Sequence, residues 1–258
     1  MIYHLRISLS KSEMNLRNKT PLMIACRYGS VESVRVLLER KAKPNTIINN
    51  KCAFSEMIKI INDEICKFED EFNNLEEYLS LTDDLREKKL VEVEYSIKES
   101  GVRSIIEKTK LLIDYGFDVN QTIDQSSALE MAMNVDVRLV KFLLDQGANP
   151  NILHCYQYII EQAIIKKDLE LVKTLIDGGA KVFVNDYITI FDRFKDENFD
   201  QKIFQVIYDH VRLQESDYII DFLHISGIIK YQKSVLKELV IQDNGLLTKT
   251  NRYGYTDG

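Results

Sequence analysis

The stretch NKTPLMIACRYGSVESVRVLLERKAKPN, residues 18–45, carries the signals of two helices joined by a short loop. Thr20 followed by Pro21 is typical of a helix start, because a threonine side chain caps free N–H groups and proline fits the first helical position. Apolar residues in the second half are spaced three and four apart, which places them on one helix face. The stretch therefore predicts a helical pair whose apolar faces need a neighbouring element to bury them.

Three later segments repeat the second half of this unit. They read TKLLIDYGFDVN (109–120), VKFLLDQGANPN (140–151) and VKTLIDGGAKVF (172–183), against VRVLLERKAKPN at 34–45. In the later copies a glycine follows the helix, at the position where a helix ends in the left-handed conformation. Lys41 takes this position in the first copy and is expected to cost stability there. The sequence thus predicts a series of similar helical repeats.

The repeated unit resembles the ankyrin repeat, whose pattern is roughly G-x-T-P-L-H-x-A-A-x-x-G-x-x-x-x-V-x-x-L-L-x-x-G-A-x-x-N. Residues 18–45 match it closely, with Met23 in place of histidine and Cys26 in place of the second alanine. Later copies match less well, and residues 127–130 (SALE) stand for T-P-L-H. The resemblance implies an all-α fold, an ankyrin-like α-solenoid in which neighbouring repeats bury each other's apolar faces. It also implies a protein-binding scaffold without enzymatic activity.

The spacing of the copies gives the expected organisation of the chain. The predicted parts are an N-terminal extension (1–13), repeat 1 (14–45), repeat 2 (46–120), repeat 3 (121–151), repeat 4 (152–183), a degenerate repeat 5 (184–215), C-terminal capping helices (216–249) and a tail (250–258).

Repeat 2 is far longer than the others, since 75 residues separate Asn45 from Asn120, about 42 more than one ankyrin unit. Apolar residues three or four apart continue from Phe54 to Leu79 and predict a long helix. A second long helix follows, and Gly101 is expected to be a weak point in it. Its predicted inner face is lined by Leu85, Val91, Tyr95, Val102, Ile105, Ile106, Leu112 and Ile113. The sequence therefore predicts a helical hairpin inserted at about 62–103, which we call the arm.

Composition and charge exclude several classes. Glycine and proline together number only 13 of 258 residues, too few turn-formers for a many-stranded sandwich or barrel. The net charge is −6, which argues against a nucleic-acid partner. Residues 63–100 hold 13 acidic and 5 basic side chains, a net charge of −8, so the rest of the chain has a net charge of +2. The acidity therefore belongs to the arm.

Two surfaces are candidates for binding a protein partner. The resemblance places one on the turn tips and first helices of the repeats, with Arg17, Lys19, Arg27, Tyr28, Asn50, Lys51, Asp124, Gln125, Glu130 and Tyr187 as its residues. Charge places the other on the arm, at Glu69, Asp70, Glu71, Glu76 and Glu77. The function expected is that of an adaptor, an inhibitor or a host-directed effector. Self-assembly through the arm is the alternative, so the chain is a monomer or an arm-mediated dimer.

No catalytic, cofactor-binding or metal-binding residue is predicted. The four histidines are far apart and none is paired at metal-ligand spacing, so no metal and no cofactor are expected. An enzyme with a site near His210 or His224 in the degenerate C-terminal third remains the competing class. No apolar run reaches the length of a membrane span, and the first twelve residues do not form a signal peptide. A cytoplasmic location is expected, with delivery into a host cell as an alternative.

Overall fold

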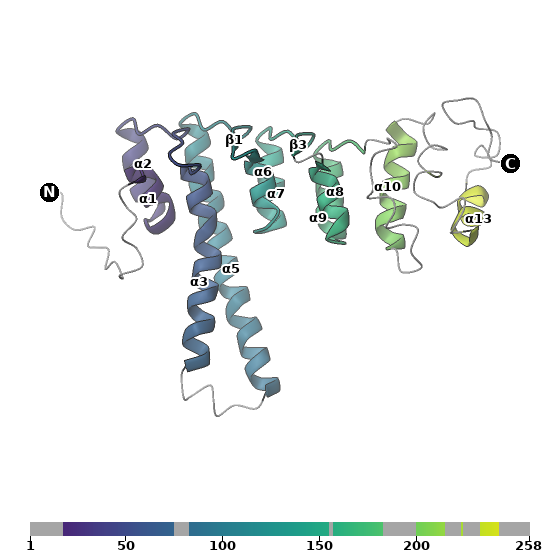
Figure 1. The fold of residues 1–258 in the computed structure, drawn as a ribbon, viewed down its shortest axis with the longest axis horizontal. Helices are drawn as coiled ribbons and strands as arrows, with labels where there is room; N and C mark the ends of the chain where they lie inside the picture. The colour runs from purple at the N-terminus through teal and green to yellow at the C-terminus, as the bar shows by residue number, and fades with distance from the viewer. Residues whose placement is uncertain are drawn as a thin grey trace. The chain divides into compact units, whose positions relative to one another are not determined.

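The computed structural model describes residues 18–74, 83–154, 157–182, 200–214, 223 and 233–242, and it forms two compact units that divide between Ala148 and Asn149. Unit 1 contains α1 (Pro21–Tyr28), α2 (Val31–Glu39), α3 (Ala53–Asn74), α5 (Asp83–Asp114), β1 (Thr122–Ile123), β2 (Ser126–Ser127), α6 (Ala128–Ala132) and α7 (Val137–Asp145). Unit 2 contains β3 (Leu153–His154), β4 (Gln157–Tyr158), α8 (Ile159–Ile165), α9 (Leu169–Asp177), α10 (Gln201–Gln214) and α13 (Lys233–Gln242). The predicted fold class is confirmed: helical pairs follow one another along the chain, and one pair in unit 1 is much longer than the rest (Figure 1).

Helix α1 begins after Thr20, the cap residue expected from the sequence, and the starts of α1 and α3 both involve a sulfur atom. At the start of α1, Met23 N–H donates to Thr20 Oγ1 (3.1 Å), and Thr20 N–H donates to Met23 Sδ (3.4 Å). At the start of α3, Cys52 N–H donates to Ser55 Oγ (2.9 Å), and Ser55 N–H donates to Cys52 Sγ (3.3 Å). These reciprocal contacts are those of a capping box, in which a sulfur atom replaces one of the usual oxygens. The substitutions in the motif therefore keep the helix start intact.

Helix ends follow the glycine pattern read from the sequence. Gly116, Gly147 and Gly179 have φ angles of 91°, 86° and 89°, the left-handed conformation that ends a helix. Lys41, in the corresponding position of the first repeat, has φ 66°. A side chain with a Cβ is strained there, because the left-handed conformation brings Cβ close to the following carbonyl oxygen.

Lys41→Gly is therefore expected to raise the free energy of unfolding by about 0.5–1 kcal/mol, the strain relieved less the extra entropy of glycine in the unfolded chain. Urea denaturation followed by circular dichroism measures the change. Gly147→Ala is the matched control and should change stability in the opposite direction by a similar amount, because a Cβ at Gly147 meets no atom within 4 Å. If Lys41→Gly destabilises the protein, the strain argument is wrong.

The asparagine that closes the first three copies of the motif has a structural role. Its side-chain amide donates to the carbonyl oxygen of the glycine that ends the next motif copy. The Nδ2 to O distances are 2.7 Å for Asn45 to Gly116, 3.2 Å for Asn120 to Gly147 and 3.1 Å for Asn151 to Gly179. The repeated asparagine thus ties the loop after one repeat to the loop after the next.

Asn45→Ala is expected to lower the free energy of unfolding by about 1–2 kcal/mol. The change removes the donor to Gly116 and also the acceptor for Asp118 N–H, which lies 2.8 Å from Asn45 Oδ1. Thr46→Ala in the same loop is the control, since it removes only a local bond to Lys43 O (3.2 Å). Equal effects of the two changes in thermal denaturation would contradict a linking role for Asn45.

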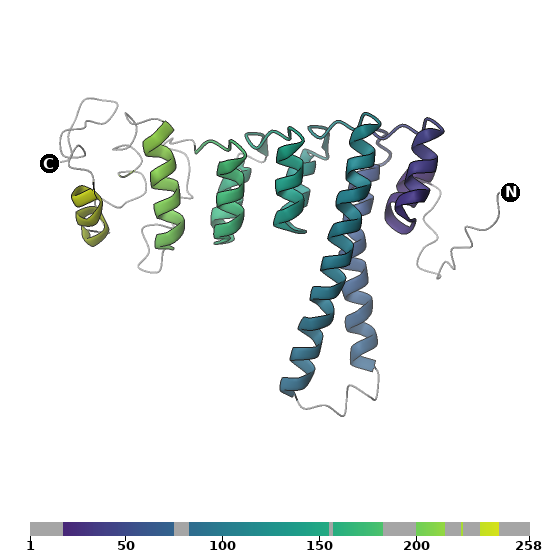
Figure 2. The ribbon, with the colours of Figure 1, turned by 180° about the vertical axis from the view of Figure 1, so that it is seen from behind.

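The arm, predicted at about 62–103, is the projecting part of a hairpin formed by α3 and α5, which pack against each other (Figures 1 and 2). Both views show them side by side, extending beyond the ends of α1, α2, α6 and α7 of the same unit. On α3 the first part of the predicted apolar stripe is turned inward, with Phe54 and Ile61 buried and Phe68 half-buried, and the end of the stripe at Leu79 lies outside the described residues. A Cβ on Gly101 would come within 2.8 Å of Ile61 Cγ1. Gly101 is thus more than the predicted weak point, because it allows the two helices to approach closely.

The inner face predicted for α5 is wrong at three residues. Leu85, Val91 and Tyr95 are 53%, 59% and 69% exposed. Leu85 and Val91 are six residues apart, and Val91 and Tyr95 are four apart. A spacing of six does not match the helical period of 3.6 residues, so the three side chains do not share one helix face. The residues that are buried or half-buried recur every three or four positions: Leu90, Val93, Ile97, Gly101 and Ile105. Val102 and Leu112 from the predicted set are buried as expected.

Candidate protein-binding surfaces

The first surface consists of the turn tips of unit 1. Asn49 and Asn50 have φ angles of 48° and 56°, and Asp124 and Gln125 have φ angles of 52° and 66°. Two successive positive φ angles are those of the type I′ turn of a tight hairpin, where asparagine and aspartate are tolerated best. The flanking residues pair, Ile48 with Lys51 and Ile123 with Ser126. Asn50, Asp124 and Gln125 are exposed and Lys51 is half-buried, so the predicted tip residues of these two turns are available to a partner.

The predicted residues Lys19 and Arg27 belong to a charge cluster around Glu56, whose side chain is fully buried. Glu56 Oε2 accepts from Lys19 Nζ at 2.6 Å and from Arg27 Nη1 at 2.9 Å. Arg27 Nη2 also donates to Asp63 Oδ2 at 2.6 Å, and Lys59 Nζ lies 3.4 Å from Glu56 Oε1. The cluster therefore joins residues from the first repeat to the first half of α3.

The electrostatics of the cluster favour a charged Glu56. Burial raises the pKa of Glu56, but hydrogen bonds from Lys19 and Arg27 outweigh it, and the pKa falls to about 2. The pKa of Arg27 is raised: burial lowers it, and the hydrogen bonds to Glu56 and Asp63 more than compensate. The carboxylate of Glu56 thus stays ionised at neutral pH and holds both cations in place.

Two residues predicted to contact a partner are therefore committed to the fold. The side chains of Lys19 and Arg27 are only 10% and 17% exposed and bind Glu56. The Arg27 guanidinium also lies over the ring of Tyr28, 5.2 Å from its centroid, as a cation–π contact. Glu130 is half-buried in the first turn of α6. No local motif marks Glu56 or Asp63, because their partners are 29 to 37 residues earlier in the chain.

A buried lysine fixes the base of the arm. Lys108 on α5 is 3% exposed, and its Nζ donates to Cys26 O at 3.0 Å. Cys26 belongs to the last turns of α1, where carbonyl oxygens lack helical partners and favour a cation. Burial lowers the pKa of Lys108. The contact anchors α5 to the first repeat, and nothing in the sequence pattern predicted it.

The second surface is the exposed side of the arm. Of the predicted acidic residues, Asp70 is exposed on α3. Glu69 and Glu71 belong to α3, but their side chains are outside the described part of the chain. Four further predicted residues lie outside the described residues altogether: Arg17, Glu76, Glu77 and Tyr187. What the sequence missed here is that Val91 and Tyr95 of α5 face solvent.

Of the two histidines considered above, the structure describes one. His210 is half-buried in α10, and its Nε2 lies 2.9 Å from Ala180 O. His224 lies outside the described residues. Among the residues that are described, no group of three or more histidine, cysteine, aspartate or glutamate side chains could hold a metal ion. None of the described helices is both long and apolar enough to cross a membrane.

The family model of the ankyrin repeat matches residues 17–50. Among solved structures, the chain is similar to the ankyrin repeat domain of Bcl-3, described as a unique member of the IkappaB protein family. The identity is 21%, the match covers 64% of this chain and 72% of that one, and the TM-score is 0.35. No curated protein matches the chain significantly.

The stretch that opened the sequence analysis is therefore an ankyrin repeat, and the resemblance is confirmed. Ankyrin repeats are protein-interaction modules that typically have no enzymatic activity, and they indicate a protein-binding scaffold.

Proposed function

We propose that this scaffold binds its protein partner through the arm, as an adaptor, an inhibitor or a host-directed effector. The observation that carries the proposal is the exposure of Val91 and Tyr95, at 59% and 69%, on a helix that extends beyond its neighbours. The two residues are four positions apart and therefore adjacent on one helix face. Tyrosine is one of the residues enriched in binding hot spots, and Val91 beside it enlarges the exposed apolar surface.

The surroundings of the pair indicate what kind of partner fits. Their nearest neighbours along the helix surface are Glu87, Lys88, Glu92, Glu94, Lys98 and Glu99. Glu99 is ion-paired with Arg138 of α7. The remaining three carboxylates against two ammonium groups still give this face a negative charge, in keeping with the net charge of −8 over residues 63–100. We infer a partner with an apolar pocket surrounded by basic side chains, since complementary charges raise the association rate and the specificity.

The double variant Val91→Ser/Tyr95→Ser tests this proposal in affinity capture from the native cell. We expect partner recovery to fall at least tenfold, which corresponds to about 1.4 kcal/mol, with the far-ultraviolet circular dichroism unchanged. Leu213→Ser is the matched control, because Leu213 is an 86% exposed leucine on α10 and should leave recovery unchanged. If the double variant and the control recover the partner equally, the arm face is not the binding surface.

Self-association through the arm is the second candidate, favoured by the same exposed apolar pair. Light scattering on the full chain and on a form with residues 64–100 replaced by a short turn distinguishes it. A dimer that becomes a monomer on deletion supports self-association, whereas two monomers contradict it.

We also propose a reducing compartment, the cytoplasm or that of a host cell after delivery. Cys26, Cys52 and Cys66 are free, and Cys66 is exposed. An exposed free thiol persists where glutathione and thioredoxin keep cysteines reduced. Labelling of Cys66 in intact cells with a permeable thiol reagent tests this, and prior oxidation of Cys66 would contradict it.

A further inference from the structure

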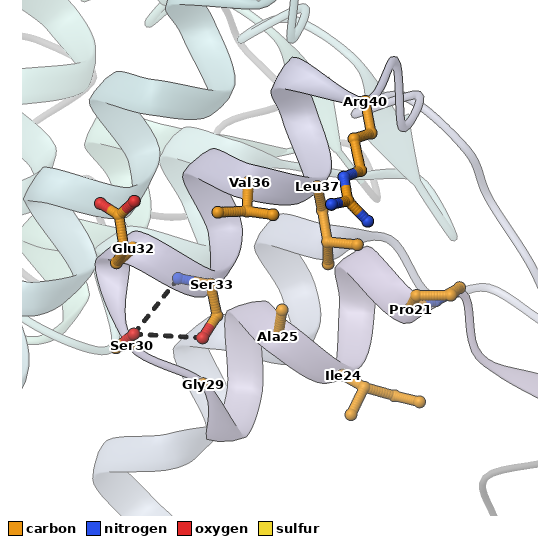
Figure 3. Close-up of a pocket in the computed structure, with 10 residues that line it drawn as sticks. All are labelled: Pro21, Ile24, Ala25, Gly29, Ser30, Glu32, Ser33, Val36, Leu37 and Arg40. Atoms are coloured by element: carbon orange, nitrogen blue, oxygen red, sulfur yellow. Dashed lines mark hydrogen bonds between the residues drawn. The ribbon is translucent and has the colours of Figure 1, made fainter. Parts of the chain in front are cut away.

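An open apolar groove lies on the first repeat, on the side that carries no residue of α3 or α5 (Figure 3). Its volume is about 640 Å³, and residues between 21 and 40 line it. The floor and walls are apolar, from Ile24, Val36 and Leu37, all of which are half-buried. Glu32 and Arg40 lie among the lining residues and supply charge. Apolar side chains that stay in contact with water are unfavourable, so a segment that covers this groove would stabilise the protein.

The second repeat packs on one side of the first repeat and leaves the side with the groove uncovered. Helix α1 packs on α3, and α2 packs on α5, so one side of the first repeat is covered by the second repeat. Stacked repeats bury an apolar face on both sides, and a terminal repeat needs a polar outer face or a cover. The first repeat has an apolar outer face and so requires a cover.

We propose that the chain's own N-terminal segment, residues 3–9, occupies this groove. The segment alternates strictly between apolar and polar side chains: Tyr3, Leu5, Ile7 and Leu9 against His4, Arg6, Ser8 and Ser10. A period of two places the apolar set on one side of an extended chain, as in a segment with one buried face. Neither the repeat motif nor the arm uses this pattern.

The dimensions allow the segment to reach and fill the groove. Helix α1 starts at Pro21, which itself lines the groove. Residues 10–19 can span up to about 33 Å, which is ample for the chain to fold back. From Leu5 to Leu9 an extended chain covers about 13 Å, close to the length of about 12 Å expected for the eight residues of α1. Attachment to α1 also keeps the local concentration of the segment high.

Disulfide trapping in the full chain tests the proposal, with Cys66→Ser and Cys155→Ser as background, because Cys66 is exposed and Cys155 lies outside the described residues. Leu37→Cys is combined in turn with a cysteine at each position from 4 to 9, and the fraction trapped under mild oxidation is measured on non-reducing gels. We expect intramolecular disulfides to form severalfold faster from positions 5, 7 and 9 than from positions 4, 6 and 8. The alternation is the signature of an extended segment with its apolar side in the groove.

Three outcomes would overturn the proposal. Equal trapping at odd and even positions means that the segment meets the groove only by random collision. Trapping between two chains, seen as a dimer on the gel, means that a second copy covers the groove. No trapping at any position, with Leu37→Cys still reactive toward a thiol reagent, means that the groove stays open to an outside partner. The matched variants Leu5→Ser/Ile7→Ser and Arg6→Ser/Ser8→Ala give a second readout, and only the first should increase the fluorescence of a dye that binds apolar surface.

Discussion

Replacing Glu56 by glutamine is expected to lower the free energy of unfolding by about 3 kcal/mol. The change keeps the size of the side chain but removes the charge that Lys19 and Arg27 neutralise at 2.6 and 2.9 Å. Removing one partner of a buried ion pair costs about 3–5 kcal/mol, because the remaining charge is buried without compensation. We expect the lower end, since Arg27 keeps its bond to Asp63.

The same residue makes stability depend on acid pH. The pKa of the Glu56 carboxyl group is about 2 in the folded protein, against the ordinary value of 4.5 that applies in the unfolded chain. The unfolded chain therefore binds a proton at Glu56 more readily than the folded protein does. The stabilisation is therefore fully present above about pH 4.5 and is lost as the pH falls towards 2. In urea denaturation at a series of pH values, the wild type should lose stability more steeply over this window than Glu56→Gln.

Glu32→Gln is the control for the charge change. Glu32 is 73% exposed and lies 3.3 Å from Arg35, so its loss should change stability by less than about 0.5 kcal/mol. A Glu56→Gln variant as stable as this control, or one with the acid dependence of the wild type, would show that the cluster does not hold the first two repeats together.

Phe54→Ala should have an effect of similar size, a loss of about 3–5 kcal/mol. Phe54 at the start of α3 is fully buried, and its ring stacks on Phe117 just after α5, with 5.7 Å between ring centroids. The pair joins the two ends of the arm at its base. Truncation leaves a cavity that the packed helices cannot close, so amide hydrogen exchange in the first turns of α3 should also become faster.

Two variants separate the cavity effect from a general effect of mutation. Phe54→Leu keeps most of the volume and should cost clearly less than alanine. Leu85→Ala removes a 53% exposed leucine on the arm and should be close to neutral. Equal losses for Phe54→Ala and Leu85→Ala would mean that the base of the arm is not packed as described.

Local chemistry made much of this fold predictable from the sequence. Helix starts depend on a cap and its third neighbour, as at Thr20 and Met23, and helix ends depend on a residue that accepts a positive φ. Helix starts and helix ends can therefore be predicted from a few consecutive residues of the sequence. The stripe on α3 was also predictable, because spacings of three and four are sustained from Phe54 onward.

The features that decide the candidate surfaces were harder to predict, because they depend on contacts across the chain. Glu56 looks like any acidic residue on a helix until Lys19 and Arg27 are brought to it. On α5, apolar residues occur on more than one face, so the sequence could not tell that Tyr95 faces solvent while Ile97 is half-buried. The correct register is set by the close approach at Gly101.

The most direct test of binding through the arm is photocrosslinking in the native cell. A photoreactive amino acid is placed at Tyr95 on the arm or at Gln125 on a turn tip, both of which are exposed. We predict that position 95 yields a crosslink to one partner protein and that position 125 yields none. Crosslinks from position 125 alone would contradict the account and place the partner on the repeat turns.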